Sequence, residues 1–345
     1  MLSIYTLDKA DDWDEIVKSF KDYDTYWLSG YVKGFQIHGE GEPLLFYYED
    51  DKSRAINAVM ERDIADCPYF ADKFPRGEWF DLATAYGYGG WLVEGENSDK
   101  IYTSYKNWCK KNNIVCEFAR FHPIVKNHVF AEKHYNIVPL GLTVAMDLSS
   151  PETIWANITS KNRNMIRKAQ KNGVQIFSGS SFELYGIFKE IYNETMDRDH
   201  ASKHYYFAKK FYESVSTDLP NNAQIFYATY EGKIISASIM LFANGKMNYH
   251  LSGSMKEFSS LASTNLLLYE AALWGSANGY KTLYLGGGVG SEEDSLFKFK
   301  KAFYRGDDLN RFYIGKCIFN EDKYNELVGM RDDLAETGFF PKYRA

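Results

Sequence analysis

The chain has 345 residues, 45% of them hydrophobic and 25% charged, so either half can bury a hydrophobic core and two domains are expected. Its net charge of -6 and pI of about 5.7 exclude a protein that coats nucleic acid non-specifically, although a local basic patch remains compatible. The N-terminus has no basic and apolar leader, and the longest apolar run, Ile234–Ala243, is too short to span a bilayer. We therefore expect a cytoplasmic protein without a membrane span, with room for a peripheral membrane contact.

The first half of the chain predicts a hairpin followed by a helix and a strand. Pro43–Asp50 and Arg54–Asp63 are apolar runs on either side of a short polar turn, which is typical of a β-hairpin. Ile101–Asn113 reads as a helix, and Ile114–Phe121 reads as the strand that follows it. A strand-like run stops near Leu148, and Pro151 can open a new helix. We therefore place a domain boundary there, between a domain of residues 1–148 and a domain of residues 149–345.

The second half has the clearer architecture. Ala223–Tyr230, Ile234–Phe242 and Met247–Ser254 are strand-like and are separated by short turns, one of which contains Asn244-Gly245, a strong hairpin dipeptide. A helix is predicted over residues 260–280, a strand over 282–285 and a helix over 295–305. The predicted order is an antiparallel meander, then helix, strand and helix.

This order resembles the acyltransferase core of the GNAT superfamily, in which two neighbouring parallel strands part and the acyl donor lies in the gap. The first half contains a weaker copy of it, because YKNWCKKNNIVCEFARF and YEAALWGSANGYKTLYLGGG share a Tyr, a Trp and an Asn-rich helix end before a strand. The resemblance implies an α+β fold with two GNAT-like domains, each a mixed, partly splayed β-sheet flanked by helices.

Four segments resemble the Fem-type family of peptidoglycan interpeptide-bridge aminoacyltransferases: Thr84–Trp91, Phe118–His128, Ile154–Val174 and His250–Phe303. The resemblance implies an N-acyltransferase that moves an aminoacyl or acyl group onto an amine of a peptidoglycan or polysaccharide precursor. It also implies a donor that is aminoacyl-tRNA or acyl-CoA, with no tightly bound cofactor. The alternative is a catalytically silent GNAT-like module that binds a nucleotide-sugar or a muropeptide.

Direct acyl transfer needs a deprotonated amine, a positioned carbonyl and donors for the oxyanion, but no covalent nucleophile. The expected donor-binding residues are Gly286, Gly287 and Gly288, whose bare backbone can approach a ligand, together with Lys301. The resemblance makes Lys300 the residue that steadies the substrate or the transition state. His250, at the end of a meander strand, is a candidate general base or else a core histidine.

Further residues are predicted to bind the substrate. Tyr86, Gly87 and Tyr88 belong to a Gly-rich run that, as a strand, would turn both tyrosines to one side as a stacking floor. Residues 153–182 carry five basic side chains and no acidic one, with Arg163 and Arg167 on one helical stripe, which favours a phosphate-bearing partner over a solvated helix face. The remaining candidates for this role are Arg198, Tyr206 and Asn265. No zinc pattern or other metal site is predicted.

Overall fold

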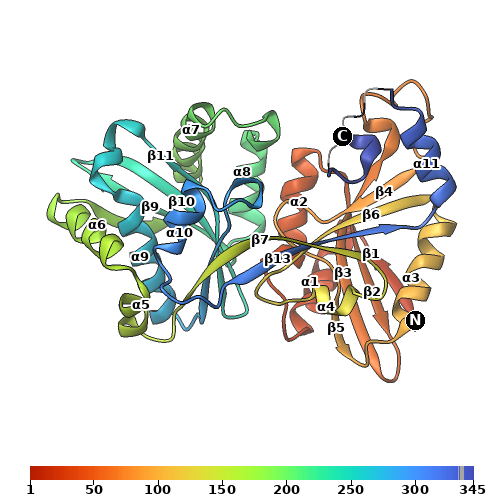
Figure 1. Ribbon diagram of the computed structural model, residues 1–345, viewed down its shortest axis with the longest axis horizontal. Helices are drawn as coiled ribbons and strands as arrows, with labels where there is room; N and C mark the ends of the chain where they lie inside the picture. The colour runs from red at the N-terminus through yellow and green to blue at the C-terminus, as the bar shows by residue number, and fades with distance from the viewer. Residues whose placement is uncertain (333, 335–337) are drawn as a thin grey trace. The chain divides into compact units, whose positions relative to one another are not determined.

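The computed structural model describes residues 1–332, 334 and 338–345, and it forms two compact units. Unit 1 comprises Met1–Leu140 and Phe312–Ala345, and unit 2 comprises Gly141–Arg311 (Figure 1). We expected one cut after residue 148, whereas the observed division is discontinuous. The reason is that β13 (Asn310–Ile318) returns the chain to unit 1, where it pairs with β6 (Ile114–Phe121).

The sheet of unit 1 has the order β1-β2-β3-β4-β6-β13, and β5 pairs separately with β3. β4 runs parallel to β6, whereas the other pairs are antiparallel, so the sheet is mixed. The predicted hairpin is confirmed, because β2 and β3 pair antiparallel from Glu42↔Glu61 to Glu49↔Arg54, with a short turn between them. The remaining strands of this unit are β1 (Leu2–Tyr5), β2 (Glu42–Glu49), β3 (Ser53–Asp63), β4 (Phe80–Ala83) and β5 (Leu92–Gly95).

The helices of unit 1 lie against this sheet. The helix predicted over residues 101–113 is α3, and its Ile101, Tyr105 and Cys109 join the core beneath β2, β3 and β6. α2 packs on β2 and β3, and α11 packs on β6. These helices are α1 (Ala10–Ser19), α2 (Ser29–His38), α3 (Asp99–Lys111), α4 (His128–Ala131) and α11 (Glu321–Gly329).

The sheet of unit 2 has the order β7-β12-β11-β10-β9-β8, and the predicted meander is its antiparallel half. Asn244 and Gly245 take positive φ values of 49° and 75°, as the hairpin between β10 and β11 requires. The strands are β7 (Asn136–Asp147, from Gly141 within this unit), β8 (Gln175–Gly179), β9 (Ala223–Tyr230), β10 (Lys233–Ala243), β11 (Lys246–Ser254) and β12 (Thr282–Gly286).

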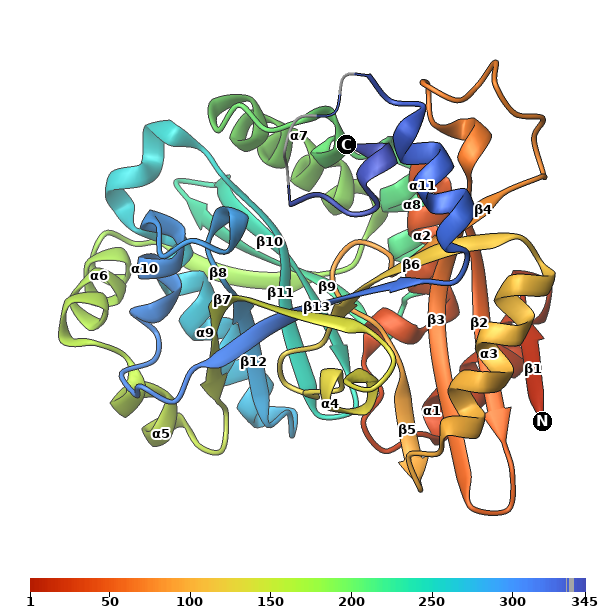
Figure 2. The ribbon, with the colours of Figure 1, turned by 45° about the vertical axis from the view of Figure 1, so that its right-hand side comes forward.

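Helices cover both faces of the unit 2 sheet. α9 packs with α5 and α6 on one face, whereas α7 lies on the other and presses its backbone against Gly253 of β11 (Figure 2). The bounds are α5 (Pro151–Asn157), α6 (Ser160–Lys171), α7 (Phe182–Arg198), α8 (Lys209–Asp218), α9 (Ser263–Ala277) and α10 (Ser295–Lys301). Among the described residues, we find no helix with the length and apolarity needed to cross a membrane.

The two parallel strands of unit 2 part after a short pairing. β11 and β12 are joined only from Lys246↔Thr282 to Asn248↔Tyr284, and β11 then continues to Ser254 paired with β10 but not with β12. The register with β10 shifts at this point, since Ile239 faces Leu251 but Met240 faces Tyr249, which makes His250 the extra residue of a β-bulge. A bulge bends and twists its strand. The expected splay is therefore present, and the bulge at His250 marks where it begins.

Candidate active site

Lys300 lies at the splay of unit 2. It belongs to α10, a short helix whose first turn is capped by Asp294, the acceptor for the Phe297 amide at 2.8 Å. The Lys300 side chain is only 9% exposed, and its Nζ donates to the carbonyl oxygen of Gly287 at 2.7 Å. Its ammonium also lies 6.0 Å from the centre of the Tyr249 ring. Lys300 thus contacts the end of β12 directly and lies close to Tyr249 of β11.

Burial sets the protonation of Lys300. Removal from water lowers the pKa of its ammonium to about 8, although the nearby Asp294 carboxylate opposes the shift. The group is therefore largely charged at neutral pH and loses its proton under mildly alkaline conditions. A partly desolvated cation of this kind interacts strongly with a developing negative charge.

The triple glycine is required first by the packing of the chain itself. Gly286 has a φ of +82°, a region that glycine adopts without a steric penalty. A Cβ on Gly287 would lie 2.9 Å from the carbonyl oxygen of Leu142, and one on Gly288 would overlap the carbonyl oxygen of Glu292 and the carboxylate of Asp294. The bare backbone thus brings β12, β7 and the cap of α10 together, and the donor-binding role of these glycines stays a prediction.

His250 occupies the bulge of β11. Burial lowers the pKa of its imidazole to about 3, so the ring is neutral at physiological pH and holds a proton poorly. Next to it, burial raises the pKa of the Tyr249 hydroxyl, while hydrogen bonds with Ser252 and Ser238 oppose that shift. A general base works best with a pKa near the operating pH. The base role of His250, like its alternative as a core histidine, stays a prediction.

The other predicted residues of unit 2 connect its elements. Lys301 donates to the carbonyl oxygens of Tyr304 (3.0 Å) and Gly306, so its ammonium holds the turn after α10. Asn265 of α9 donates to Asn162 of α6 at 2.7 Å, and Asn162 donates to the Ala302 carbonyl at 3.3 Å. Asn162 thereby joins α6 to the end of α10, and Asn265 ties α9 to the same point of α6.

Arg198 and Tyr206 lie near the far end of β11. Arg198 Nη1 donates to the carbonyl oxygen of Ser254 at 2.9 Å, which ties the end of α7 to the end of the strand. Tyr206 donates to Asp197 at 2.7 Å, and this bond raises the pKa of the tyrosine. Both contacts organise the loop after α7, and binding of substrate by these two residues stays a prediction.

In unit 1, the tyrosines of the Gly-rich run do not form the strand that we expected. Gly87 has a φ of +99°, and this turn directs the two rings to different neighbours. Tyr86 stacks on Phe35 with centroids 5.8 Å apart, whereas Tyr88 meets the edge of Tyr26 at 5.3 Å. A Cβ on Gly87 would lie 2.6 Å from Tyr26, so glycine is needed for close packing at the turn.

Side chains distant in sequence fix this run, and sequence reasoning missed them. The Glu40 carboxylate accepts the Tyr86 amide at 2.9 Å, and the Tyr31 hydroxyl donates to the Tyr86 carbonyl. Burial raises the pKa of Glu40 to about 7, although the Tyr86 amide bond, Arg120 and Arg62 oppose the shift. Asn127 Nδ2 donates to the carbonyl oxygen of Gly89 at 2.8 Å. The backbone from Tyr86 to Gly89 is therefore held in one conformation.

The fully buried His122 and Asp24 support the same run. His122 Nε2 lies 3.1 Å from Asp24, while its Nδ1 accepts the amides of Ile124 and Val125. Since Nδ1 accepts, the ring proton is on Nε2 and donates to Asp24. The pair resembles a catalytic dyad, but both ring nitrogens are engaged, so its role is structural. The ring of His122 lies 5.3 Å from that of Tyr88, which it helps to place.

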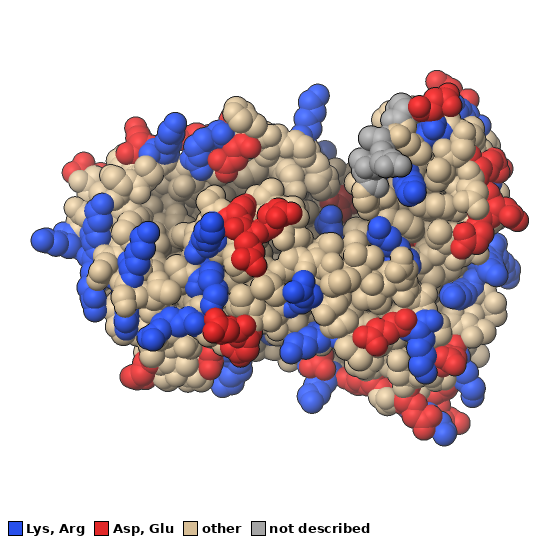
Figure 3. Space-filling view, viewed as in Figure 1, with Lys and Arg blue, Asp and Glu red and all other residues tan. Residues whose placement is uncertain are grey.

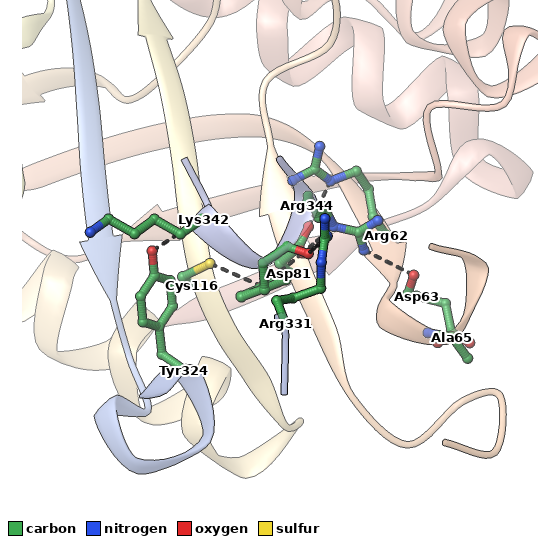
Figure 4. Close-up of polar contacts among 10 residues, drawn as sticks. Arg62, Asp63, Ala65, Asp81, Cys116, Tyr324, Arg331, Lys342 and Arg344 are labelled. Carbon is green, nitrogen blue, oxygen red and sulfur yellow. Dashed lines mark hydrogen bonds and ion pairs between the residues drawn. The ribbon is translucent and has the colours of Figure 1, made fainter. Parts of the chain in front are cut away.

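A second polar cluster of unit 1 is also buried (Figure 4). Asp81 of β4 is fully buried and accepts hydrogen bonds from Arg62 (2.6 Å), Arg344 (2.6 Å) and the hydroxyl of Tyr343 (2.8 Å). Burial alone would raise the pKa of Asp81, but the two guanidinium groups hold it below its ordinary value. Arg331 donates to the Tyr343 carbonyl at 2.7 Å. The cluster anchors the C-terminal segment to the sheet, and none of its members was expected to be functional.

Metal binding finds no support among the described residues, where no group of three His, Cys, Asp or Glu side chains is placed to hold an ion. The polar groups at the splay include the Lys300 ammonium, the Gly287 carbonyl and the Tyr249 hydroxyl.

Known proteins resemble this chain in sequence and in fold. Residues 140–233 match the model of the FemAB family. The UDP-N-acetylmuramoylpentapeptide-lysine N(6)-alanyltransferase of Weissella viridescens is 26% identical over 321 residues, which is 85% of this chain and 89% of the relative. The predicted resemblance to the Fem-type family is confirmed. The crystal structure of FemX, at 12% identity, superposes on this chain with a TM-score of 0.69, and the match covers 94% of this chain and 99% of FemX.

The fold class is confirmed as well. A tandem GNAT protein from the clavulanic acid biosynthesis pathway, 9% identical, matches with a TM-score of 0.50 over 93% of this chain and 99% of its own length. At such low identity the likeness concerns the fold alone. It agrees with the mixed sheets of the two units and with the parting of β11 and β12.

Proposed function

We propose that the chain is an N-acyltransferase that moves an aminoacyl or acyl group onto an amine of a cell-envelope precursor. The observation that carries this proposal is the splay of β11 and β12, where the buried ammonium of Lys300 lies against the Gly287 carbonyl. The name of the Weissella relative describes alanyl transfer to a lysine N6 of a UDP-linked muropeptide, which supports an acceptor of the same class here.

The reaction needs no covalent intermediate on the protein. The acceptor nitrogen attacks the carbonyl carbon of the ester or thioester, the C–N bond forms, and the bond to the carrier oxygen or sulfur breaks. The proton of the amine leaves with the carrier. An ammonium has three N–H groups, and among the described residues Gly287 is the hydrogen-bond acceptor of Lys300. The other N–H groups can stabilise the oxyanion that forms in the splay.

Of the two donors that the family resemblance implies, we propose aminoacyl-tRNA and keep acyl-CoA as the alternative. The basic helix α6 favours the larger polyanion, because its positive charges exceed what a few phosphates neutralise. With a donor of this kind and a UDP-linked acceptor, the proposed reaction would take place in the cytoplasm.

Turnover with defined substrates tests the function. The protein is incubated with radiolabelled alanyl-tRNA, glycyl-tRNA or acetyl-CoA and with UDP-linked muropeptides or amino sugars, and the product is identified by its mass. We expect a product one acyl group heavier than the acceptor, with Lys300→Ala nearly inactive and the variant of an exposed lysine, Lys281→Ala, close to wild type. If calorimetry detects binding of the muropeptide but no donor yields a product, the result would instead support the silent binding module.

A further inference from the structure

α6 presents an uncompensated row of positive charge. Asn162, Ile166 and Ala169 are buried against unit 2, while the opposite side of the helix carries basic residues that are exposed or half-buried. These residues are Lys161, Arg163, Arg167, Lys168 and Lys171. Arg163, Arg167 and Lys171 are four residues apart, so they follow one stripe roughly 12 Å long at 1.5 Å per residue.

Basic residues outside α6 extend this surface. The end of α10 is joined to α6, because the Thr159 amide donates to the Ala302 carbonyl at 3.0 Å. Arg305 follows α10, and its amide donates to Asn157 of α5 at 2.9 Å. Lys298 and Arg305 are both exposed. Figure 3 shows Lys and Arg side chains gathered over α6, and further ones near α10, where a group of acidic side chains lies beside them. We call these two residues and the five of α6 the basic surface.

Acidic side chains do not neutralise the basic surface. Among the described residues, the ion pairs with Asp or Glu involve none of its seven members. In a chain of net charge -6, such a concentration of like charge raises the free energy of the unliganded surface through mutual repulsion. A partner with many negative charges removes that repulsion.

An aromatic side chain lies within the basic surface. The guanidinium groups of Arg163 and Arg167 are 5.8 and 5.1 Å from the centre of the Trp155 ring, and Tyr269 packs against the same ring at 5.1 Å. Trp155 is half-buried and so retains an accessible part. Arginine planes beside an indole suit nucleotides, because bases stack on either and phosphates bind the guanidinium.

We propose that the basic surface docks the backbone of an RNA stem, so that the acylated end of that RNA reaches the splay. This inference rests on the proposed function, since it names the docking place of the donor. The connection is short: Asn162 of α6 donates to Ala302, which lies two residues after Lys300. Seven cations, on α6, on α10 and just after α10, fit a duplex with phosphates on both strands better than the single pyrophosphate of a nucleotide.

Direct binding tests the proposal without turnover. Fluorescence anisotropy is measured with uncharged tRNA and with an RNA hairpin that mimics an acceptor arm, over a salt series. The test variant is Arg163→Gln/Arg167→Gln/Lys171→Gln. The control is Lys100→Gln/Lys110→Gln/Lys111→Gln on α3 of unit 1, which removes the same number of charges. Thermal melting shows whether both variants fold.

We expect the α6 variant to bind RNA at least 10-fold more weakly than the wild type. The slope of log K against log salt concentration should become shallower by about 2 to 3, because three phosphate contacts disappear. The control should keep the wild-type slope. Equal losses in both variants would mean that net charge alone matters, and would overturn the assignment. An α6 variant that binds RNA normally but no longer binds vesicles of phosphatidylglycerol would overturn it in favour of a membrane surface. RNA binding that needs α6 but is followed by no transfer from charged tRNA would uphold the docking surface and reject the proposed function.

Discussion

The Nζ of Lys300 lies 2.7 Å from the carbonyl oxygen of Gly287, which joins a buried cation on α10 to the end of β12. Lys300→Ala should lower kcat by about 100- to 1000-fold, the usual effect of losing one oxyanion donor. The KM of the acceptor should change little. Steady-state kinetics with the transfer assay measures both values. Lys281→Ala is the matched control, because Lys281 is an exposed lysine of the same unit and lies outside the basic surface. A normal kcat in Lys300→Ala would remove Lys300 from the mechanism.

The pKa of Lys300 predicts an alkaline limit of activity. Burial lowers this pKa to about 8, so kcat/KM should fall above pH 8 as the ammonium loses its proton. In Lys300→Arg the limb should move to higher pH, since a guanidinium stays charged. A rate profile from pH 6 to 10 on both proteins provides the measurement. An alkaline limb at the same pH in Lys300→Arg would assign it to another group.

The burial of the Lys300 ammonium should also lower the free energy of unfolding. Its folded pKa of about 8 lies below the value of 10.5 in the unfolded chain, so the unfolded state binds the proton more strongly between these pH values. Stability should rise with pH across that window, and the penalty should be fully present at pH 7. Lys300→Met should therefore raise the free energy of unfolding at pH 7 by about 1 to 3 kcal/mol, with little gain near pH 10. Urea titrations at both pH values would detect this, and an equal gain at both would point to packing instead.

Local sequence predicted those parts of the fold that depend on local signals. Asn244-Gly245 specifies a hairpin by itself, and the apolar spacing of residues 101–113 specifies a helix, so both were found. The return of β13 to β6 pairs Ile318 with Cys116, and no local pattern records a contact over such a separation. The boundary after residue 148 therefore differed from the observed division.

Sequence reasoning about the site had the same limit. Lys300 could be named because the resemblance identified its helix, but its bond to Gly287 required the structure. Glu40 reaches the amide of Tyr86 across 46 residues and was not anticipated. The alternation of polar and apolar residues along β11 does not reveal the bulge at His250. The lowered pKa of the His250 imidazole therefore could not be predicted from the sequence.

The contribution of Glu40 to the stability of the folded protein should change with pH in the opposite sense to that of Lys300. Its folded pKa of about 7 lies above the ordinary value of 4.5, so the folded state binds the proton more strongly and stability is lost as pH rises from 4.5 to 7. Glu40→Gln keeps an oxygen for the Tyr86 amide but carries no charge. It should be more stable than wild type at pH 8, by about 1 to 3 kcal/mol, and nearly equal at pH 4.5.

Calorimetric melting at the two pH values measures this difference. Glu96→Gln is a suitable control, because this carboxylate is 65% exposed and pairs with Lys52 at the surface. A Glu40→Gln protein that is less stable at pH 8 would mean that the charged carboxylate, rather than its acceptor oxygen, holds the run around Tyr86.

Asp81 should matter far more than a surface carboxylate. Removing its charge leaves Arg62 and Arg344 without their shared partner, and breaking a buried ion pair costs about 3 to 5 kcal/mol. Asp81→Asn should therefore unfold at much lower urea concentration. Asp66→Asn is the control, because its pair with Arg76 is 54% and 80% exposed and such pairs contribute about 0 to 1 kcal/mol. Similar small effects of both substitutions would show that the C-terminal segment is held by packing alone.

Gly288→Ala tests whether the glycines serve packing before binding. A Cβ there would overlap the carbonyl oxygen of Glu292 and the carboxylate that caps α10, and backbone cannot yield as a flexible side chain can. We expect a loss of about 1 to 3 kcal/mol and a fall in kcat, because a displaced cap moves Lys300. Gly186→Ala on α7 is the control, since its Cβ would meet open space and alanine favours a helix by about 1 kcal/mol. If Gly288→Ala kept full stability and lost only affinity for the donor, these glycines would instead act by contacting the ligand.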